Sequence, residues 1–316
     1  MNILILGGAG FLGNNLVRYC LTKKRHSIVV VDSLEKRLKS SLSSLKPILP
    51  KITFIKGDIR DLRLMKRVVK NTDRIFNCAA QTSHPLSLRD PLWDVSINCH
   101  GHLTVLEALR MVNKKAVIIY TSSSTVVGES LGKVVDETRA EYPLDIYSAN
   151  KTVVEKYYRI YNRVYGLKTA SIRFANLYGP YGKGHPEFGF VNFFIDRAYH
   201  DQEITIFGDG KQHRNIMYVE DAADLLYKAA QTPRLIGNVY FGVHREHYSV
   251  LTIAKKIISV FKRGKIKKVP WPDLRARIEI KDVIIAGDKL YKALKWEPRY
   301  NLRQGLLKTK RILQKQ

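Results

Sequence analysis

Short apolar runs alternate with longer segments of helical spacing along the first half of the chain. The runs are four or five residues long, as in buried strands, and the segments between them place apolar side chains three or four positions apart. This alternation predicts a parallel sheet covered by helices. Strands are expected at residues 3–6, 28–31, 52–55, 74–78 and 116–120, and helices after Gly13, after Asp61, at 93–112 and from the segment 143–151 to about 165.

The second half of the chain contains the same kinds of element. Helices are expected at 190–198, 220–230, 249–261 and 302–313, and strands at 204–206 and 238–241. We therefore predict an α/β fold with a doubly wound parallel sheet and a smaller α/β substrate-binding domain. The functional boundary is expected near residue 176, between a dinucleotide-binding part (1–176) and a substrate-binding part (177–316), and some later elements are expected to rejoin the first sheet.

A glycine-rich turn follows the first predicted strand. Gly7, Gly10 and Gly13 allow a tight turn and a close approach of the backbone to a pyrophosphate, and the helix that follows offers free N–H groups to phosphate oxygens. Asp32 ends the second strand, 19 residues after Gly13, where an acid can bind both hydroxyls of an adenosine ribose. Because Asp32 is followed by Ser33 and not by arginine, the pattern predicts NAD and not NADP.

The next two strands also end in residues that suit a cofactor. Asp58 follows the third strand and could accept a hydrogen bond from an adenine amino group, because ligands bind at the carboxyl ends of open parallel sheets. The fourth strand ends in Ala79, Ala80 and Gln81, where small side chains let a cofactor pass close to the backbone.

A tyrosine and a lysine four positions apart follow the fifth strand and its serine cluster. On a helix, Tyr147 and Lys151 share one face. A phenol with an ordinary pKa near 10 is a poor base at neutral pH, and a nearby ammonium would lower that pKa. We therefore expect Tyr147 to act as a catalytic base assisted by Lys151.

Composition restricts the other possibilities. Cys20, Cys78 and Cys99 are far apart in sequence, which predicts buried free thiols in a reducing compartment and no metal site. No apolar run reaches the roughly 18 residues of a membrane span, so we expect a cytoplasmic protein without membrane contact. The net charge of +26 is spread over many short basic groups, which indicates a solvated surface that attracts an anionic substrate, not a nucleic-acid site.

The motifs together resemble the extended short-chain dehydrogenases/reductases of the nucleotide-sugar epimerase and dehydratase family, which includes UDP-glucose 4-epimerase. The resemblance runs nearly from end to end and is carried by the segments 7–13, 57–59, 79–81, 122–128, 147–151, 173–180, 207–214 and 296–298. It implies a Rossmann-type NAD domain, a nucleoside diphosphate sugar as substrate, and a homodimer paired through the helices near residues 93 and 147. His102 departs from the family pattern, because a threonine is common there.

The resemblance also implies roles for individual residues. Ser123, Tyr147 and Lys151 take the catalytic positions. The cofactor positions are Gly7, Gly10, Phe11, Leu12, Gly13, Asp32, Ser33, Asp58, Ile59, Ala79, Ala80, Gln81, Asn98, Thr121, Tyr147, Lys151 and Phe174. The substrate positions are Ser123, Asn176, Thr205, Phe207, Arg214 and Arg275, with Arg277 as a competitor for the last.

The two residues after Ser123 help to distinguish dehydration from epimerisation. Relatives that remove water from C5 and C6 of the sugar carry Asp-Glu there, whereas this chain has Ser124 and Thr125, which offer no carboxylate. A 4-epimerase needs no further acid or base, so we predict a nucleoside-diphosphate-sugar 4-epimerase. A 4,6-dehydratase or a 2-epimerase stays open, with the loop 182–187 as a source of the missing base, and a non-catalytic dinucleotide-binding regulator is a more remote alternative.

Overall fold

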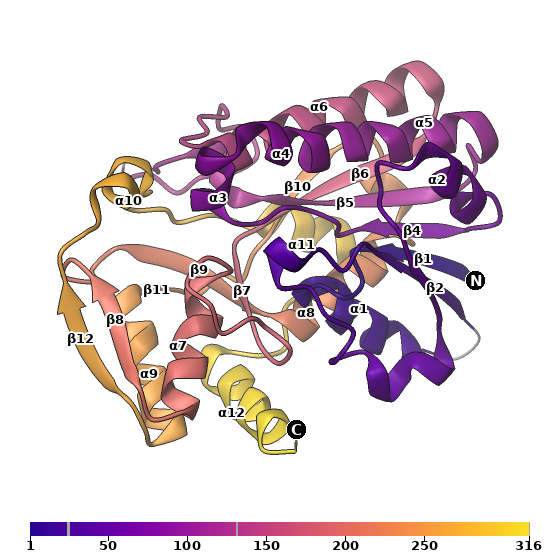
Figure 1. Cartoon of the computed structure of the whole chain (residues 1–316). Helices are drawn as coiled ribbons and strands as arrows, with labels where there is room; N and C mark the ends of the chain where they lie inside the picture. The colour runs from indigo at the N-terminus through magenta and orange to yellow at the C-terminus, as the bar shows by residue number, and fades with distance from the viewer. Residues whose placement is uncertain (24–25, 131, 316) are drawn as a thin grey trace.

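A parallel sheet with helices on both faces forms the larger part of the molecule (Figure 1). The structure is a computed structural model that describes residues 1–23, 26–130 and 132–315, apart from the side chains of residues 274 and 275. Among the described residues, seven strands run in the order β10-β6-β5-β4-β1-β2-β3, and all neighbours are parallel. They are β1 (Asn2–Leu6), β2 (Ser27–Asp32), β3 (Thr53–Lys56), β4 (Arg74–Asn77), β5 (Val117–Ser123), β6 (Lys168–Phe174) and β10 (Val239–Gly242).

This topology confirms the predicted doubly wound sheet. The chain builds outward from β1 through β2 to β3, then returns to β4 on the other side of β1 and continues to β5 and β6. The reversal of direction opens a crevice at the carboxyl ends of β1 and β4, which is where such sheets bind ligands.

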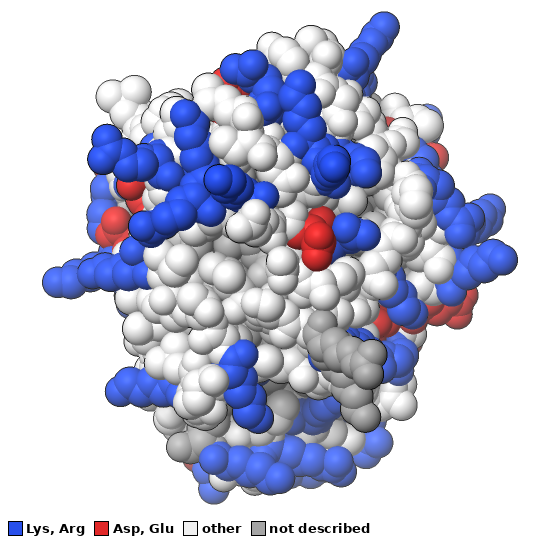
Figure 2. Space-filling view, turned by 90° about the vertical axis from the view of Figure 1, so that its right-hand side faces the viewer, with Lys and Arg blue, Asp and Glu red and all other residues white. Residues whose placement is uncertain are grey.

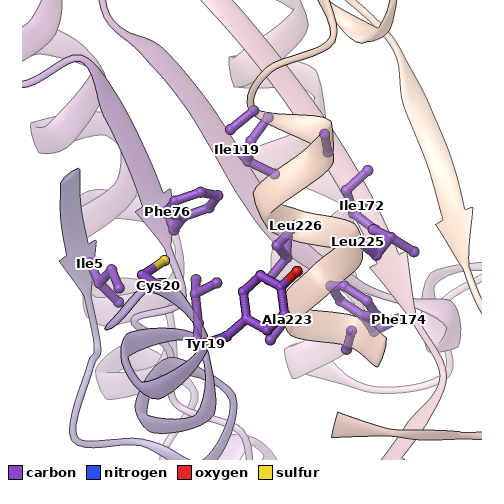
Figure 3. Packing of buried hydrophobic residues seen from close by; sticks show 14 of the residues in the cluster. Ile5, Tyr19, Cys20, Phe76, Ile119, Ile172, Phe174, Ala223, Leu225 and Leu226 are labelled. Carbon is purple, nitrogen blue, oxygen red and sulfur yellow. The ribbon is translucent and has the colours of Figure 1, made fainter. Parts of the chain in front are cut away.

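Two apolar layers enclose the sheet. On one face, α1 (Phe11–Leu21), α8 (Val219–Ala229) and α11 (Asp288–Leu294) cover the strands, and on the other α2 (Leu62–Val69), α5 (His102–Val112) and α6 (Ile146–Tyr165) do so. Figure 3 shows the first layer, in which Tyr19 and Cys20 of α1 and Leu226 of α8 pack against side chains of the strands, such as Phe76 and Ile119. Burial of these side chains fixes the two helices against the sheet.

The second half of the chain forms a smaller layered unit beside the sheet (Figure 1). Its strands are β7 (Asn176–Tyr178), β9 (His213–Tyr218) and β11 (His247–Ser249) in one sheet, and β8 (Glu203–Phe207) and β12 (Lys265–Val269) in another. Its helices are α7 (Phe190–Tyr199), α9 (Val250–Phe261), α10 (Asp273–Ile278) and α12 (Leu302–Leu313). The chain crosses between the two units more than once, since β10 and α8 belong to the large sheet and its cover.

Two local features differ from the expectation for residues 84–112. The expected single helix at 93–112 is divided into α4 (Pro91–Val95), a π-helical segment (Ser96–Gly101) and α5. A short helix that was not predicted, α3 (His84–Arg89), precedes it and is capped by Ser83, whose hydroxyl accepts from Leu86 N at 3.2 Å. With only six residues and a proline in its first turn, α3 has too few positions to show a helical period.

On the face drawn in Figure 2, the basic side chains are spread over several areas. Figure 2 shows Lys and Arg side chains over the upper and lower parts of one face, with few Asp or Glu among them. No helix within the described ranges has both the length and the apolar character that a bilayer crossing requires. The three cysteines are free, and Cys20 and Cys99 are buried.

His102, the departure from the family pattern noted above, is a fully buried residue of α5. Its Nδ1 lies 3.0 Å from Nδ2 of Asn77 and its Nε2 lies 3.1 Å from the carbonyl oxygen of Ala79, so the neutral imidazole satisfies both neighbours. Burial lowers the pKa of His102 to about 3, and the charge of Lys151 acts in the same direction.

Protonation of His102 should therefore link stability to pH. The unfolded chain binds a proton at His102 near its ordinary pKa of 6.5 and the folded chain does not, so stability is complete above pH 6.5 and is lost as the pH falls toward 3. At pH 5 this one residue should cost about 2 kcal/mol of unfolding free energy relative to pH 7.5. Urea denaturation of the wild type and His102→Gln at both pH values tests this. An equal loss of stability in the two proteins would contradict it.

Candidate active site

A cavity of about 490 Å³ lies at the carboxyl ends of the central strands, between the large sheet and the smaller unit. Its walls include most of the residues singled out in the sequence: Gly7, Gly10, Phe11, Leu12, Gly13, Asp32, Ser33, Asp58, Ile59, Ala79, Ala80, Thr121, Ser123, Tyr147, Lys151, Phe174, Asn176 and Arg214. Segments that are far apart in the chain are thus brought to one enclosed space.

The glycine turn between β1 and α1 is packed too closely for side chains. Gly7 has φ of +75°, and a Cβ there would lie 2.6 Å from the backbone nitrogen of Ala79. A Cβ on Gly13 would lie 2.2 Å from the carbonyl oxygen of Gly7. No side chain of the described residues caps α1, so N–H groups of its first turn are available to a phosphate. These features fit the pyrophosphate of a dinucleotide.

The two acids at the strand ends are held in different ways. Asp32 accepts from the backbone N–H of Ala9 at 2.9 Å and of Leu34 at 2.8 Å, although its burial raises the pKa of the carboxyl above the ordinary value. Asp58 is paired with Arg60, whose Nη2 lies 2.7 Å from Oδ2. Asp32 therefore has a fixed orientation in the cavity, while Asp58 shares its acceptor capacity with a neighbouring guanidinium.

Ser123, Tyr147 and Lys151 meet where β5 ends and α6 begins. Lys151 Nζ donates to the carbonyl oxygen of Thr121 at 3.0 Å and lies 5.7 Å from the centre of the Tyr147 ring. Ser123 is hydrogen-bonded to Tyr147 and lies 2.8 Å, between hydroxyl oxygens, from Thr125, which in turn accepts from Ser148 at 2.8 Å. A chain of hydroxyl groups thus leads from Tyr147 through Ser123 to the first turn of α6.

Burial dominates the electrostatics of this group. Burial raises the pKa of Tyr147 above its ordinary value, and the hydrogen bond from Ser123 opposes the rise. Burial also lowers the pKa of Lys151 to about 8, against the attraction of Asp94. Burial is the largest cause of both shifts, and the lowering of the Tyr147 pKa that is expected in the loaded enzyme stays a prediction.

On the substrate side of the cavity, Arg214 is nine-tenths buried and already engaged. Its guanidinium donates to Glu279, to the carbonyl oxygen of Ile280 and, at 2.7 Å, to the carbonyl oxygen of His213. Glu279 also lines the cavity. A diphosphate that reached Arg214 would have to compete with this carboxylate.

Several predicted residues do not reach the cavity wall. Gln81 and Asn98 are buried beside it and bond to each other, with Gln81 N donating to Asn98 Oδ1 at 3.1 Å. Thr205 lies in β8, paired with Lys267, and the Phe207 ring lies 5.3 Å from that of Trp271. The side chain of Arg275 lies outside the described part of the structure, and Arg277 is exposed on α10.

The structure also brings to the cavity residues that the sequence reasoning did not select. His84 and its ion-pair partner Asp145 lie beside Tyr147, and Lys183 lies where it is attracted by Asp32. Burial lowers the pKa of Lys183 to about 8. In the sequence, His84 lies three residues after Gln81, and this is the nearest indication that it reaches the cavity. No hydrophobic periodicity supports that placement.

The loop 182–187 was expected to supply a base. Its acid, Glu187, is already bound by other side chains. Glu187 lines the cavity, yet Arg89 Nη2 lies 2.8 Å from its Oε1 and Ser83 Oγ lies 3.2 Å from its Oε2. Both contacts come from α3 or its cap. Glu187 thus serves to close the loop against α3.

Comparison with known proteins identifies the class. The chain belongs to the NAD dependent epimerase/dehydratase family, whose model matches residues 3–250. The glycine turn, Asp32 and the cavity agree with the NAD dependence of that family, and NAD is the cofactor. The protein is therefore an enzyme of the class that acts on nucleotide sugars.

Individual relatives cover nearly the whole chain. A putative UDP-glucose 4-epimerase of Methanocaldococcus jannaschii is 31% identical over 96% of this chain and 95% of its own length. A CDP-paratose 2-epimerase of Salmonella typhi is 27% identical over 98% of each. The crystal structure of a UDP-glucose 4-epimerase with UDP-glucose from Thermotoga maritima has a TM-score of 0.89 at 28% identity, covering 100% of this chain and 99% of that one.

Proposed function

We propose that this protein is an NAD-dependent nucleoside-diphosphate-sugar 4-epimerase of the UDP-glucose/UDP-galactose type. The observation that carries the proposal is the hydroxyl network after Ser123. Thr125 bonds to both Ser123 and Ser148, and Ser124 is a buried serine on the cavity wall. Dehydration needs a carboxylate pair at these two positions, whereas reversible oxidation at C4 needs only the tyrosine and its supports.

The chain's own groups can perform the proton transfer at C4. Tyr147 takes the proton of the C4 hydroxyl, and Ser123, bonded to the phenol, holds that hydroxyl and the phenol in line. Lys151 supplies positive charge 5.7 Å from the phenol ring. When bound, NAD accepts the hydrogen from C4 and returns it.

The two halves of the chain divide this work in our proposal. Residues 1–176 hold NAD, and residues 177–316 hold the nucleoside diphosphate through Asn176 and Arg214. The Thermotoga maritima enzyme with UDP-glucose supports the substrate class, because its structure is similar over the whole chain. The free cysteines support a reducing compartment, and we place the enzyme in the cytoplasm.

A 2-epimerase is the second candidate. The relative from Salmonella typhi is a CDP-paratose 2-epimerase and is similar over 98% of this chain. An assay with UDP-, CDP-, GDP- and dTDP-sugars, analysed for inversion at each carbon, separates inversion at C4 from inversion at C2. A 4-keto-6-deoxy product in that assay would instead identify a dehydratase.

Removal of the phenol oxygen should stop the reaction. We expect Tyr147→Phe to lower kcat by at least about 100-fold, because no other group replaces the proton transfer, while bound NAD is retained. Activity is measured by sugar interconversion and NAD by extraction and quantification. Tyr142→Phe, on a side chain that is 69% exposed, serves as the matched control. A biological role that survived in Tyr147→Phe would favour the non-catalytic regulator.

Neutralising Glu279 should strengthen nucleotide binding. In Glu279→Gln, Arg214 loses its competing carboxylate and the cavity loses a charge that repels a diphosphate, so we expect the Kd for UDP to fall about tenfold, or roughly 1.4 kcal/mol. Isothermal titration with UDP measures it. Glu297→Gln, which removes an exposed ion pair with Arg245, is the control. Unchanged or weaker binding in Glu279→Gln would show that Arg214 does not receive the diphosphate.

An exposed apolar stripe on α6 supports a homodimer. Val153, Ile160 and Val164 are 38%, 49% and 63% exposed at helical spacing, and Met111 of the adjacent α5 is 47% exposed. Burial of such a face against a second copy would stabilise a two-fold assembly. We expect a dimer in sedimentation at micromolar concentration and a monomer for the double variant Ile160→Asp, Val164→Asp. A monomeric wild type would refute the assembly.

A further inference from the structure

An Asp–His pair stands in the cavity next to the catalytic tyrosine. His84 is the first residue of α3 and Asp145 is the N-cap of α6, and His84 Nδ1 is paired with Asp145 Oδ2. The His84 ring lies edge-on to the Tyr147 ring, with 4.6 Å between their centres. Both members of the pair line the same cavity as Ser123 and Lys151.

The pair is fixed in orientation. Asp145 Oδ1 accepts from the backbone N–H of Ser148 at 2.7 Å, and its side chain is only 5% exposed. The α3 helix that carries His84 is joined to α6 by Ser87, whose hydroxyl accepts from Tyr147 N at 3.1 Å. The imidazole therefore has little freedom to turn relative to Tyr147.

The second imidazole nitrogen is the one left for a ligand. Nδ1 faces the buried carboxylate, whereas the His84 side chain is 35% exposed, and Nε2 makes no hydrogen bond to any described residue. Burial opposes ionisation of Asp145, but the hydrogen bond with His84 Nδ1 outweighs it and holds the pKa of that carboxyl below its ordinary value. A histidine oriented by a buried carboxylate is the arrangement of a general acid–base group.

Epimerisation at C4 does not require such a group. The ketone formed during that reaction, however, has neighbouring carbons on which an acid–base group could act. Oxidation at C4 produces a ketone, and a ketone makes the hydrogens on the neighbouring carbons, C3 and C5, acidic. Tyr147 and Ser123 are occupied at the C4 oxygen, and Glu187, the nearby acid of the loop 182–187, is held by Arg89 and Ser83. His84 is the group in this part of the described cavity with a proton-accepting atom available.

We infer that His84 removes and returns a proton at C3 or C5 of the 4-keto sugar, so that the enzyme exchanges a carbon-bound hydrogen with solvent in addition to acting at C4. The C–H bond breaks, its proton passes to Nε2 of the neutral imidazole, and the electron pair forms an enolate with the C4 carbonyl. Nε2 exchanges this proton with water and then returns a proton to the same carbon, which restores the ketone with no net oxidation. Return to the opposite face would invert that carbon.

This inference depends on the proposed function, because the ketone forms only if C4 is oxidised. The test is turnover in D₂O with UDP-glucose, UDP-galactose, CDP-glucose, dTDP-glucose and GDP-mannose, followed by proton NMR of the recovered sugars at each carbon. For any sugar interconverted at C4, we expect deuterium at C3 or C5 of the wild-type product. The ratio of exchange to C4 interconversion should fall about 100-fold in His84→Gln, because the amide cannot carry the proton.

Two further variants separate chemistry from structure. Asp145→Asn keeps a side-chain oxygen that can cap α6 but removes the charge that orients and stabilises the imidazolium, so the same ratio should fall at least about tenfold. His200→Gln, in an exposed Asp–His pair with Asp196 on α7, is the matched control and should keep the wild-type ratio. Circular dichroism verifies that each variant is folded.

The outcomes distinguish the two proposals. Interconversion at C4 without deuterium at C3 or C5, or with an exchange ratio unchanged in both His84→Gln and Asp145→Asn, overturns the role of His84 and leaves the 4-epimerase intact. Absence of C4 interconversion with every sugar overturns the proposed function and this inference together.

Discussion

The hydrogen bond from Lys151 Nζ to the carbonyl oxygen of Thr121 joins α6 to the carboxyl end of β5. Both residues are buried, so this contact replaces the water that the ammonium loses, and an ammonium without a partner would be costly there. The position of α6 along β5 follows from it. Tyr147, one turn before Lys151, is thereby placed against Ser123, the last residue of the strand.

Exclusion of water shapes the rest of the site. The same burial that raises the pKa of Tyr147 lowers that of Lys151, so each group alone disfavours its charged form. The hydroxyl groups of Ser123 and Thr125 form a polar chain that begins at Tyr147. Thr125 extends that chain to Ser148, whereas carboxylates at positions 124 and 125 would add charge beside a phenol that is already hard to ionise.

The sequence predicted the parts of the site that depend on local spacing. The glycines of the first turn, Asp32 and the Tyr147–Lys151 pair all lie on the cavity because each is fixed by the end of a strand or by one turn of helix. Regular periodicity also predicted six of the seven described strands of the large sheet and the helices near 190–198, 220–230, 249–261 and 302–313, but not β6 or the order of the strands.

The residues that could not be predicted depend on contacts between distant segments. Asp145 and His84 are 61 positions apart in the sequence, and Glu279 and Arg214 are 65 positions apart. Neither contact produces a periodic pattern in the sequence. Gln81 and Asn98 were expected to bind the cofactor, but they bond to each other and to Asp94, since a buried amide must satisfy its own donors and acceptors. Thr205 and Phe207 belong to a strand whose register, set by β12, directs them elsewhere.

Charge pairing in the cavity explains why the excess of positive charge on the whole chain is a poor guide to its site. Three acids of the wall are paired with a guanidinium: Asp58 with Arg60, Glu187 with Arg89 and Glu279 with Arg214. Lys151 and Lys183 are different, because Lys151 donates to a backbone carbonyl and Lys183 does the same at Leu38. Lys151 is buried and Lys183 is half-buried on the cavity wall, and where water is excluded an ammonium group acts on an anion more strongly than an exposed lysine does. These two cations act on an anionic ligand at short range, in addition to the long-range field of the positively charged surface.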